Sequence, residues 1–219
     1  MPWGGFVTKL EGVEPFLTHH RRYDDWFVRH QAAYLSELLA VRALLPYQGN
    51  GLEIGVGTGR FAAPLGLTFG IDPAILTLIY AQERGVSVAS GVAEALPFAD
   101  AQFGYALLVT TICFVSSVET TLVEARRVLR PGGCLVVGFI DRESVLGREY
   151  LEHQAENVFY RKATFYSATE VDALLQSAGF DERIWLQTLS KPLGTITSIE
   201  PVKPGTGRGA FVVVRAHSR

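Results

Sequence analysis

Cysteine and net charge are both scarce in this sequence, and each scarcity excludes a class of function. Only two cysteines occur in 219 residues, Cys113 and Cys134, and neither has a histidine or second cysteine at a metal-binding spacing. Each lies in an apolar run that predicts a buried strand, so we expect reduced core thiols and no metal site. The formal net charge is only −2, so no positive field draws the chain to nucleic acid.

Long uncharged apolar runs are absent as well. No run reaches the length of a membrane-spanning helix, and the N-terminus MPWGGFVTKLEGVEP lacks a basic region followed by an apolar stretch. We therefore expect a soluble, unexported, cytoplasmic protein that binds neither membranes nor nucleic acid. Its length and its 48% of hydrophobic residues fit one domain over residues 1–219.

Strand-like and helical patterns alternate through most of the chain. Residues 16–45 carry apolar residues at helical spacing, which predicts one or two helices and an N-terminal helical cap over residues 1–48. Over residues 49–219, short apolar runs such as GLEIG, LTFGID and CLVVGFI alternate with helical segments, the first beginning near Thr58. Such alternation predicts an α/β core with a parallel sheet and helices on both faces.

The stretch LEIGVGTGRF, residues 52–61, places Gly55, Gly57 and Gly59 directly after the first predicted strand. Glycine permits positive φ and removes the Cβ that would keep a ligand from the backbone. In an open parallel sheet, ligands bind beyond the carboxyl ends of the strands. Asp72 ends the second predicted strand, where a carboxylate can accept hydrogen bonds from both ribose hydroxyls. Capping of the helix that begins at Pro73 is a compatible alternative role for Asp72.

The spacing of the glycines disfavours a dinucleotide. The dinucleotide motif G-x-G-x-x-G requires a third glycine where this chain has Arg60. A pyrophosphate also needs a helix N-terminus directed at it, and Pro64 would cut that helix short. An adenosine cofactor without phosphates fits the sequence better.

The chain resembles class I S-adenosylmethionine-dependent methyltransferases, of the small-molecule group that includes the quinone-biosynthesis methyltransferases. The similarity rests on LEIGVGTGRF, GIDPA, GVAEALPFADAQF, YALLVTTICFV, EARRVLRPGGCLVVGF and FYSATEVDALLQSAGF, which follow the family's order from about residue 51 to 180. It implies a Rossmann-like seven-stranded sheet, with six strands parallel and the last antiparallel. It also implies S-adenosylmethionine across the carboxyl ends of the first strands and S-adenosylhomocysteine as product.

The resemblance also assigns cofactor-binding positions. The glycine turn and the acid before it would line the methionine portion, and Thr110 would lie beside the methionine end. Asp72 would contact the ribose. The adenine would be surrounded by Pro73, Ala93, Glu94 and Leu96. The expected cofactor-binding residues are Glu53, Gly55, Gly57, Gly59, Asp72, Pro73, Ala93, Glu94, Leu96 and Thr110. Val92 stands where the family often has an aspartate, so we expect the contact with the adenine amino group to be lost or to pass to Glu94.

Methyl transfer from a sulfonium makes modest demands on side chains, because alignment and exclusion of water supply much of the acceleration. We therefore expect a methyltransferase (EC 2.1.1.-) that acts on an O, N or C atom of a small molecule. If the acceptor must lose a proton, the candidate bases are Tyr23, His30, His153 and Tyr160. Each is alternatively a packed or solvent-facing residue.

The sequence disfavours two subclasses of methyltransferase and leaves two other interpretations open. Nucleic-acid methylation lacks its usual motifs, since TTIC follows the fourth strand, and magnesium-dependent catalysis lacks a carboxylate at Thr110. A non-catalytic S-adenosylmethionine-binding sensor or partner subunit is an alternative, and a NAD-dependent oxidoreductase is a third. Both a monomer and a homodimer fit the sequence. The long loop 191–208 is expected either to cover the acceptor pocket, together with the helix around Tyr23 to Phe27, or merely to connect two strands.

Overall fold

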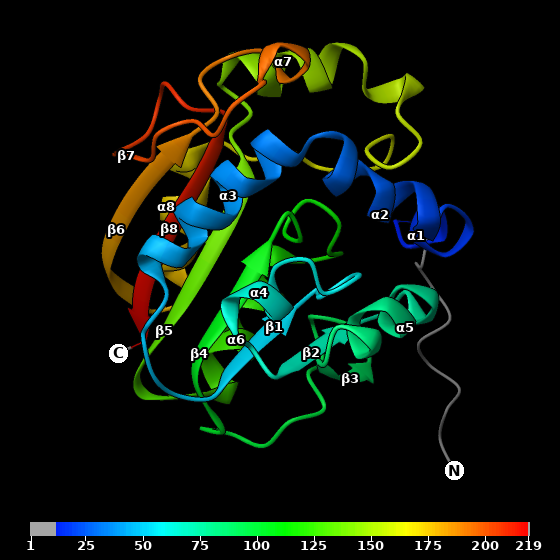
Figure 1. The fold of residues 1–219 in the computed structure, drawn as a ribbon. Helices are drawn as coiled ribbons and strands as arrows, with labels where there is room; N and C mark the ends of the chain where they lie inside the picture. The colour runs from blue at the N-terminus through cyan, green and yellow to red at the C-terminus, as the bar shows by residue number, and fades with distance from the viewer. Residues whose placement is uncertain (1–11, 219) are drawn as a thin grey trace.

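One sheet of eight strands, in the order β3-β2-β1-β4-β5-β8-β6-β7, forms the centre of the computed structural model, which describes residues 12–218 (Figure 1). The strands are β1 (Gly51–Ile54), β2 (Phe69–Asp72), β3 (Ser87–Ser90), β4 (Phe103–Val109), β5 (Leu129–Ile140), β6 (Phe180–Thr188), β7 (Lys203–Pro204) and β8 (Phe211–Ser218). The first five pair in parallel, whereas β8 runs antiparallel to both β5 and β6. Six parallel strands and an antiparallel last strand are therefore confirmed. The sequence does not predict β7, a two-residue edge strand antiparallel to β6.

Eight α-helices are described within residues 12–218, and most lie where the sequence predicts them. They are α1 (Glu14–Thr18), α2 (His20–Arg29), α3 (Gln31–Leu44), α4 (Ala62–Leu65), α5 (Ile75–Glu83), α6 (Val118–Val128), α7 (Val145–Glu152) and α8 (Ala168–Ser177), with 3-10 turns η1 (Gln154–Glu156) and η2 (Leu193–Thr195). Residues 12–48 contain three helices rather than one or two, and residues 1–11 of the predicted cap lie outside the described residues. The helix expected from Thr58 begins only at Ala62 and ends at Leu65, where Gly66 with φ +78° forms the C-cap.

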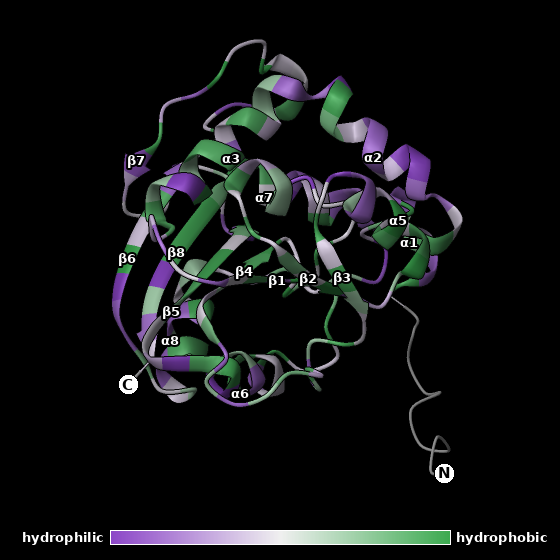
Figure 2. Ribbon diagram, turned by 60° about the horizontal axis from the view of Figure 1, so that its bottom comes forward, coloured by the Kyte–Doolittle hydropathy of each residue, from purple (hydrophilic) through white to green (hydrophobic). Residues whose placement is uncertain are grey.

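The helices cover both faces of the sheet, as the alternating pattern predicts. Figure 2 shows α6 and α8 on one side of the strands and α3 and α5 on the other. Side chains of β4 alternate accordingly: Leu107 packs in the core cluster that includes α3, and Leu108 in the cluster that includes α6. Cys134 lies in β5 as expected, but Cys113 lies in the turn after β4, although it is also buried.

The carboxyl ends of the parallel strands meet at one edge of the sheet, and the N-terminal helices pass over this edge (Figure 1). Residues on this edge come from the turns after β1, β2, β3 and β4. Across residues 12–218, no helix combines the length and apolar character needed to cross a membrane. The same residues contain no group of three or more His, Cys, Asp or Glu side chains that could hold a metal ion.

Candidate active site

A cavity of about 340 Å³ lies between the carboxyl ends of the strands and the N-terminal helices. Residues that follow each of the first four strands line the cavity wall. The expected cofactor-binding residues that line it are Gly55, Gly57, Asp72, Pro73, Ala93, Glu94 and Thr110. Val92 also lines it. The tertiary structure thus brings together positions that are 55 residues apart in the chain, from 55 to 110.

Asp72 joins the glycine turn to the end of β2. One carboxylate oxygen, Oδ2, accepts a hydrogen bond from the Gly57 amide at 2.8 Å, and Oδ1 accepts one from the Ala74 amide at 2.8 Å. Burial raises the pKa of Asp72 to about 6, although both hydrogen bonds oppose this rise. The α5 helix begins at Ile75 rather than at Pro73, and no side chain caps it, so the predicted capping role of Asp72 is wrong; Asp72 only accepts from the amide of Ala74, the residue before the helix. Each oxygen keeps a lone pair for a ligand hydroxyl, and the ribose contact remains a prediction.

Gly55 and Gly57 of the turn both have a positive φ, and a Cβ at either position would crowd a neighbouring side chain. Gly57 has φ +50°, and a Cβ there would lie 3.4 Å from the Tyr23 ring across the cavity. Gly55 has φ +77°, and a Cβ there would lie 2.4 Å from the Thr111 hydroxyl. Side chains at these positions would be strained and would fill the space through which a ligand must approach the backbone.

Glu53 lies in β1, immediately before this turn. Its side chain is buried, and burial raises its pKa well above the usual range, against a hydrogen bond from the Ala62 backbone. Its Oε2 atom has no hydrogen-bond partner among the described residues. An unpartnered buried carboxylate oxygen beside a bare backbone turn fits the ammonium group of the methionine portion of S-adenosylmethionine. Glu53 itself does not line the cavity as it stands.

Thr110 has φ +52°, a left-handed conformation that is rare for a β-branched residue. Its amide donates to the Gly138 carbonyl of β5 at 2.8 Å, which holds the turn against this strain. Such strain costs on the order of 1–3 kcal/mol and is concentrated at functional sites. The conformation places Thr110 at the cavity wall beside Thr111.

Three expected cofactor contacts are placed differently from the sequence-based assignment. Gly59 does not line the cavity; it allows close packing on α5, because a Cβ there would lie 3.0 Å from the Ala81 Cα. Leu96 is buried in the core cluster on the α6 side rather than in the cavity wall. Glu94 lines the cavity, but its Oε1 accepts from the Ser116 amide at 2.6 Å. Only its second oxygen is available for the predicted adenine contact.

The four candidate bases separate into two pairs. His30 stacks on Trp26 at 5.0 Å between ring centroids, and His153 lies on the surface, 3.7 Å from Glu156. Neither histidine lines the cavity, so the structure removes both from the candidates. Tyr23 and Tyr160 do line it, but burial raises the pKa of each phenol well above its usual value. They are poor bases and can instead contribute apolar surface and hydrogen bonds.

The part of the cavity beyond Tyr23 is aromatic, and the sequence predicted only the contribution of the helix around Tyr23 to Phe27. Its walls include rings from α1, α2, α7 and the segment after η1, and a carboxylate from α3. These residues are Phe16, Trp26, Glu37, Tyr150 and Phe159. Glu37 carried a signal in the sequence, because it is the one acid on the buried stripe of α3, with Ala33, Ala40 and Val41 at helical spacing.

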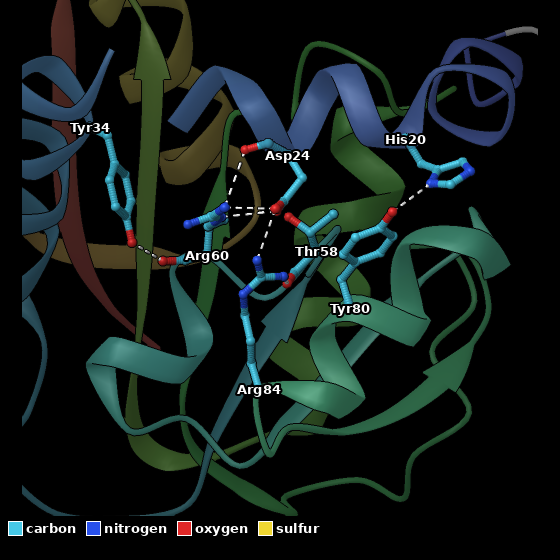
Figure 3. Close-up of polar contacts among 7 residues, drawn as sticks. All are labelled: His20, Asp24, Tyr34, Thr58, Arg60, Tyr80 and Arg84. Carbon is cyan, nitrogen blue, oxygen red and sulfur yellow. Dashed lines mark hydrogen bonds and ion pairs between the residues drawn. The ribbon is translucent and has the colours of Figure 1, made fainter. Parts of the chain in front are cut away.

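Asp24 holds α2 over the glycine turn (Figure 3). Its carboxylate accepts from Arg60 Nη2 at 2.6 Å and from Arg84 Nη2 at 2.9 Å, and Arg84 also donates to the Thr58 carbonyl at 2.7 Å. Burial disfavours the charge of Asp24, yet the hydrogen bonds from Arg60 and Thr58 hold its pKa below the usual value. Arg60 stands where a dinucleotide motif has its third glycine. In this protein its ion pair with Asp24 holds the helical cap in place.

The comparisons with known proteins agree with this geometry. A family model described as a methyltransferase domain matches residues 52–137. A crystal structure from Thermotoga maritima, described as a SAM-dependent methyltransferase and possible histamine N-methyltransferase, is 50% identical and superposes with a TM-score of 0.92. The match covers 94% of this chain and 99% of that chain.

Two further relatives were identified by sequence. An uncharacterized protein of Methanocaldococcus jannaschii is 39% identical over 201 residues, which is 92% of this chain and 97% of the relative. The ubiquinone biosynthesis O-methyltransferase of Cereibacter sphaeroides is 25% identical over 174 residues, covering 72% of this chain and 70% of that enzyme. The NAD-dependent and non-catalytic interpretations receive no support. The chain belongs to the class I S-adenosylmethionine-dependent methyltransferases.

Proposed function

We propose that this enzyme methylates a small molecule held in the aromatic part of the cavity, beyond Tyr23. The observation that carries the proposal is the continuity of the cavity. One end is formed by Gly55, Gly57 and Asp72, where the family binds its donor, and the other by the rings of Tyr150 and Tyr160. A small molecule in the aromatic end would face the donor's methyl group without a third component.

The chain's own residues supply binding, orientation and exclusion of water. When bound, S-adenosylmethionine supplies an electrophilic methyl group on a sulfonium. Glu53 and Asp72 would hold the amino and ribose ends of this donor, and the bare turn at Gly57 would let it lie against the backbone. The α2 helix, fastened through Asp24, covers part of the cavity with Tyr23 and would limit the access of solvent to a bound donor. No side chain needs to form a covalent bond.

Relatives indicate which acceptors to test first. The Thermotoga maritima protein is described as a possible histamine N-methyltransferase, and the Cereibacter sphaeroides relative is a ubiquinone biosynthesis O-methyltransferase. Amines and phenols are therefore the first two acceptor classes. The lower identity of the second relative gives the quinone-type acceptor the weaker support.

Two measurements test the proposal. Thermal unfolding with S-adenosylmethionine, S-adenosylhomocysteine and NAD should show stabilisation by the first two only, about 2.7 kcal/mol at a hundredfold excess over Kd. Asp72→Ala should reduce this response by at least about half, and the matched control Asp25→Ala, on the exposed side of α2, should keep it. S-adenosylhomocysteine formation is then measured with pooled amines and phenols. Stabilisation by NAD alone, or donor binding with no turnover of any pooled acceptor, would contradict the proposal.

A further inference from the structure

Glu37 is a carboxylate without a counter-charge, and it faces the cavity. It lies on α3, is 6% exposed and forms part of the cavity wall. Within residues 12–218 no hydrogen bond or ion pair reaches it, and burial alone raises its pKa, to about 8. Buried carboxylates are ordinarily paired, because an isolated one is costly in an apolar environment. Because Glu37 lines the cavity, a cation or a hydrogen-bond donor that enters the cavity could pair with it.

Aromatic rings surround the space that this partner would occupy. The charge of Glu37 contributes to the raised pKa values of Tyr150, Tyr160 and Tyr23, so all three phenols lie within electrostatic reach of it. The rings of Tyr150 and Tyr160 have centroids 5.2 Å apart. A carboxylate together with several aromatic faces is the set of groups that binds an ammonium ion, because the rings attract the cation and the carboxylate neutralises it.

Glu37 is separate from the acids of the donor end. The charge of Asp72 helps to raise the pKa of Glu53, and both acids help to raise the pKa of Tyr23, but neither contributes to the pKa of Glu37. The charges of Asp72, Glu53, Asp24 and Glu37 all help to raise the pKa of Tyr23, so Tyr23 lies within electrostatic reach of both Glu37 and the acids of the donor end. Two arginines, Arg22 and Arg29, also line the cavity from the exposed side of α2, and neither shifts the pKa of Glu37. Within residues 12–218, no cation therefore compensates the charge of Glu37.

We propose that Glu37 binds the ammonium group of an amine acceptor and removes a proton from it, which makes this enzyme an amine N-methyltransferase. This proposal rests on the function proposed above and specifies its acceptor class. The N–H proton moves to a carboxylate oxygen of Glu37, and the N–H electron pair stays on nitrogen as the lone pair that attacks. The nitrogen regains its positive charge when it receives the methyl group, and the carboxyl proton then leaves to solvent. A group that titrates near neutral pH suits both directions of this transfer.

The test compares amines with their matched alcohols in the protein saturated with S-adenosylhomocysteine. The probes are aralkyl, imidazolylalkyl and aliphatic amines, each paired with the alcohol in which a hydroxyl replaces the amino group. Thermal unfolding and calorimetric titration measure binding without turnover. At least one amine should bind at least tenfold more tightly than its alcohol, and it should also be methylated when S-adenosylmethionine is supplied.

Two variants attribute this preference to one residue. Glu37→Gln should reduce amine affinity and the rate of amine methylation at least tenfold, while its Kd for S-adenosylhomocysteine stays within threefold of the parent. Glu83→Gln, which changes an exposed acid of α5, should alter neither.

Several results would overturn the proposal. They are equal binding of amines and alcohols by the parent protein, no response to any amine of the panel, and full amine binding by Glu37→Gln. A tenfold loss of S-adenosylhomocysteine affinity in Glu37→Gln would place Glu37 in the donor site instead. Failure of the parent protein to bind S-adenosylhomocysteine at all would contradict the proposed function itself, which distinguishes the two proposals. The amine–alcohol comparison needs no variant, so it decides the question even if Glu37→Gln does not fold.

Discussion

Glu37→Gln should stabilise the protein, and the gain should grow with pH. Burial raises the pKa of Glu37 from 4.5 to about 8 in the folded state, whereas the unfolded chain titrates near 4.5. Between these values the folded state binds more protons than the unfolded state, so raising the pH favours unfolding. Below pH about 4.5 both states are protonated and the carboxyl costs nothing. Above pH about 8 the full cost is present, and glutamine, which is uncharged throughout, avoids it.

The magnitude follows from the size of the pKa difference. A difference of about 3.5 pKa units, at 1.36 kcal/mol per unit, sets an upper bound of about 5 kcal/mol on the gain at pH 9. Water in the cavity solvates part of the charge, so we expect a measured gain of about 2–4 kcal/mol. In a protein of this size that gain raises Tm by roughly 4–16 °C.

Urea unfolding followed by circular dichroism gives the free energy of unfolding at pH 5, 7 and 9. The difference between Glu37→Gln and the parent protein should be below about 1 kcal/mol at pH 5 and largest at pH 9. Glu83→Gln, an exposed acid on α5, should show no such trend. A gain independent of pH, or a parent protein that is the more stable at pH 9, would refute the placement of an uncompensated carboxylate in this cavity.

The remaining predictions concern the donor site, the helical cap and the long loop. Asp72→Ala should weaken S-adenosylhomocysteine binding by about 1.5–3 kcal/mol, the range for hydrogen bonds to a charged group, and unchanged calorimetric affinity in a folded variant would remove Asp72 from the site. Gly57→Val, which adds a side chain at φ +50° facing Tyr23, should abolish donor binding without loss of the circular dichroism spectrum; affinity within threefold of the parent would contradict the position of the turn. Asp24→Asn leaves two arginines without their carboxylate, so the free energy of unfolding in urea should fall by about 2–4 kcal/mol, whereas no change would show that the ion pairs do not stabilise the cap. Replacing residues 194–206 by a tight turn should lower acceptor turnover at least tenfold while donor binding survives, and unaltered turnover would make the loop a simple connection.

The long loop shows where prediction from sequence stops. Its start at the carboxyl end of β6 follows from the parallel direction of that strand, and the sequence predicts both. The structure shows that Leu193 lines the cavity and that the Glu200 amide donates to the Ser36 hydroxyl of α3 at 2.8 Å. The loop therefore packs against the helix that carries Glu37. Such a contact spans 164 positions in the chain, and no local pattern encodes it.

The sequence by itself determined the order of strands and helices and the edge of the sheet at which the expected donor-binding residues lie. Alternating apolar runs report which segments are buried on both faces, and a glycine turn followed by Asp72 reports where the backbone must stay bare, because both requirements act on neighbouring residues. The tertiary structure alone decided which side chains share the cavity. Of the four candidate bases, it placed Tyr23 and Tyr160 on the cavity wall and His30 and His153 away from it. It also exposed Glu37 to the cavity, because the packing of α3 over the sheet depends on contacts between distant segments.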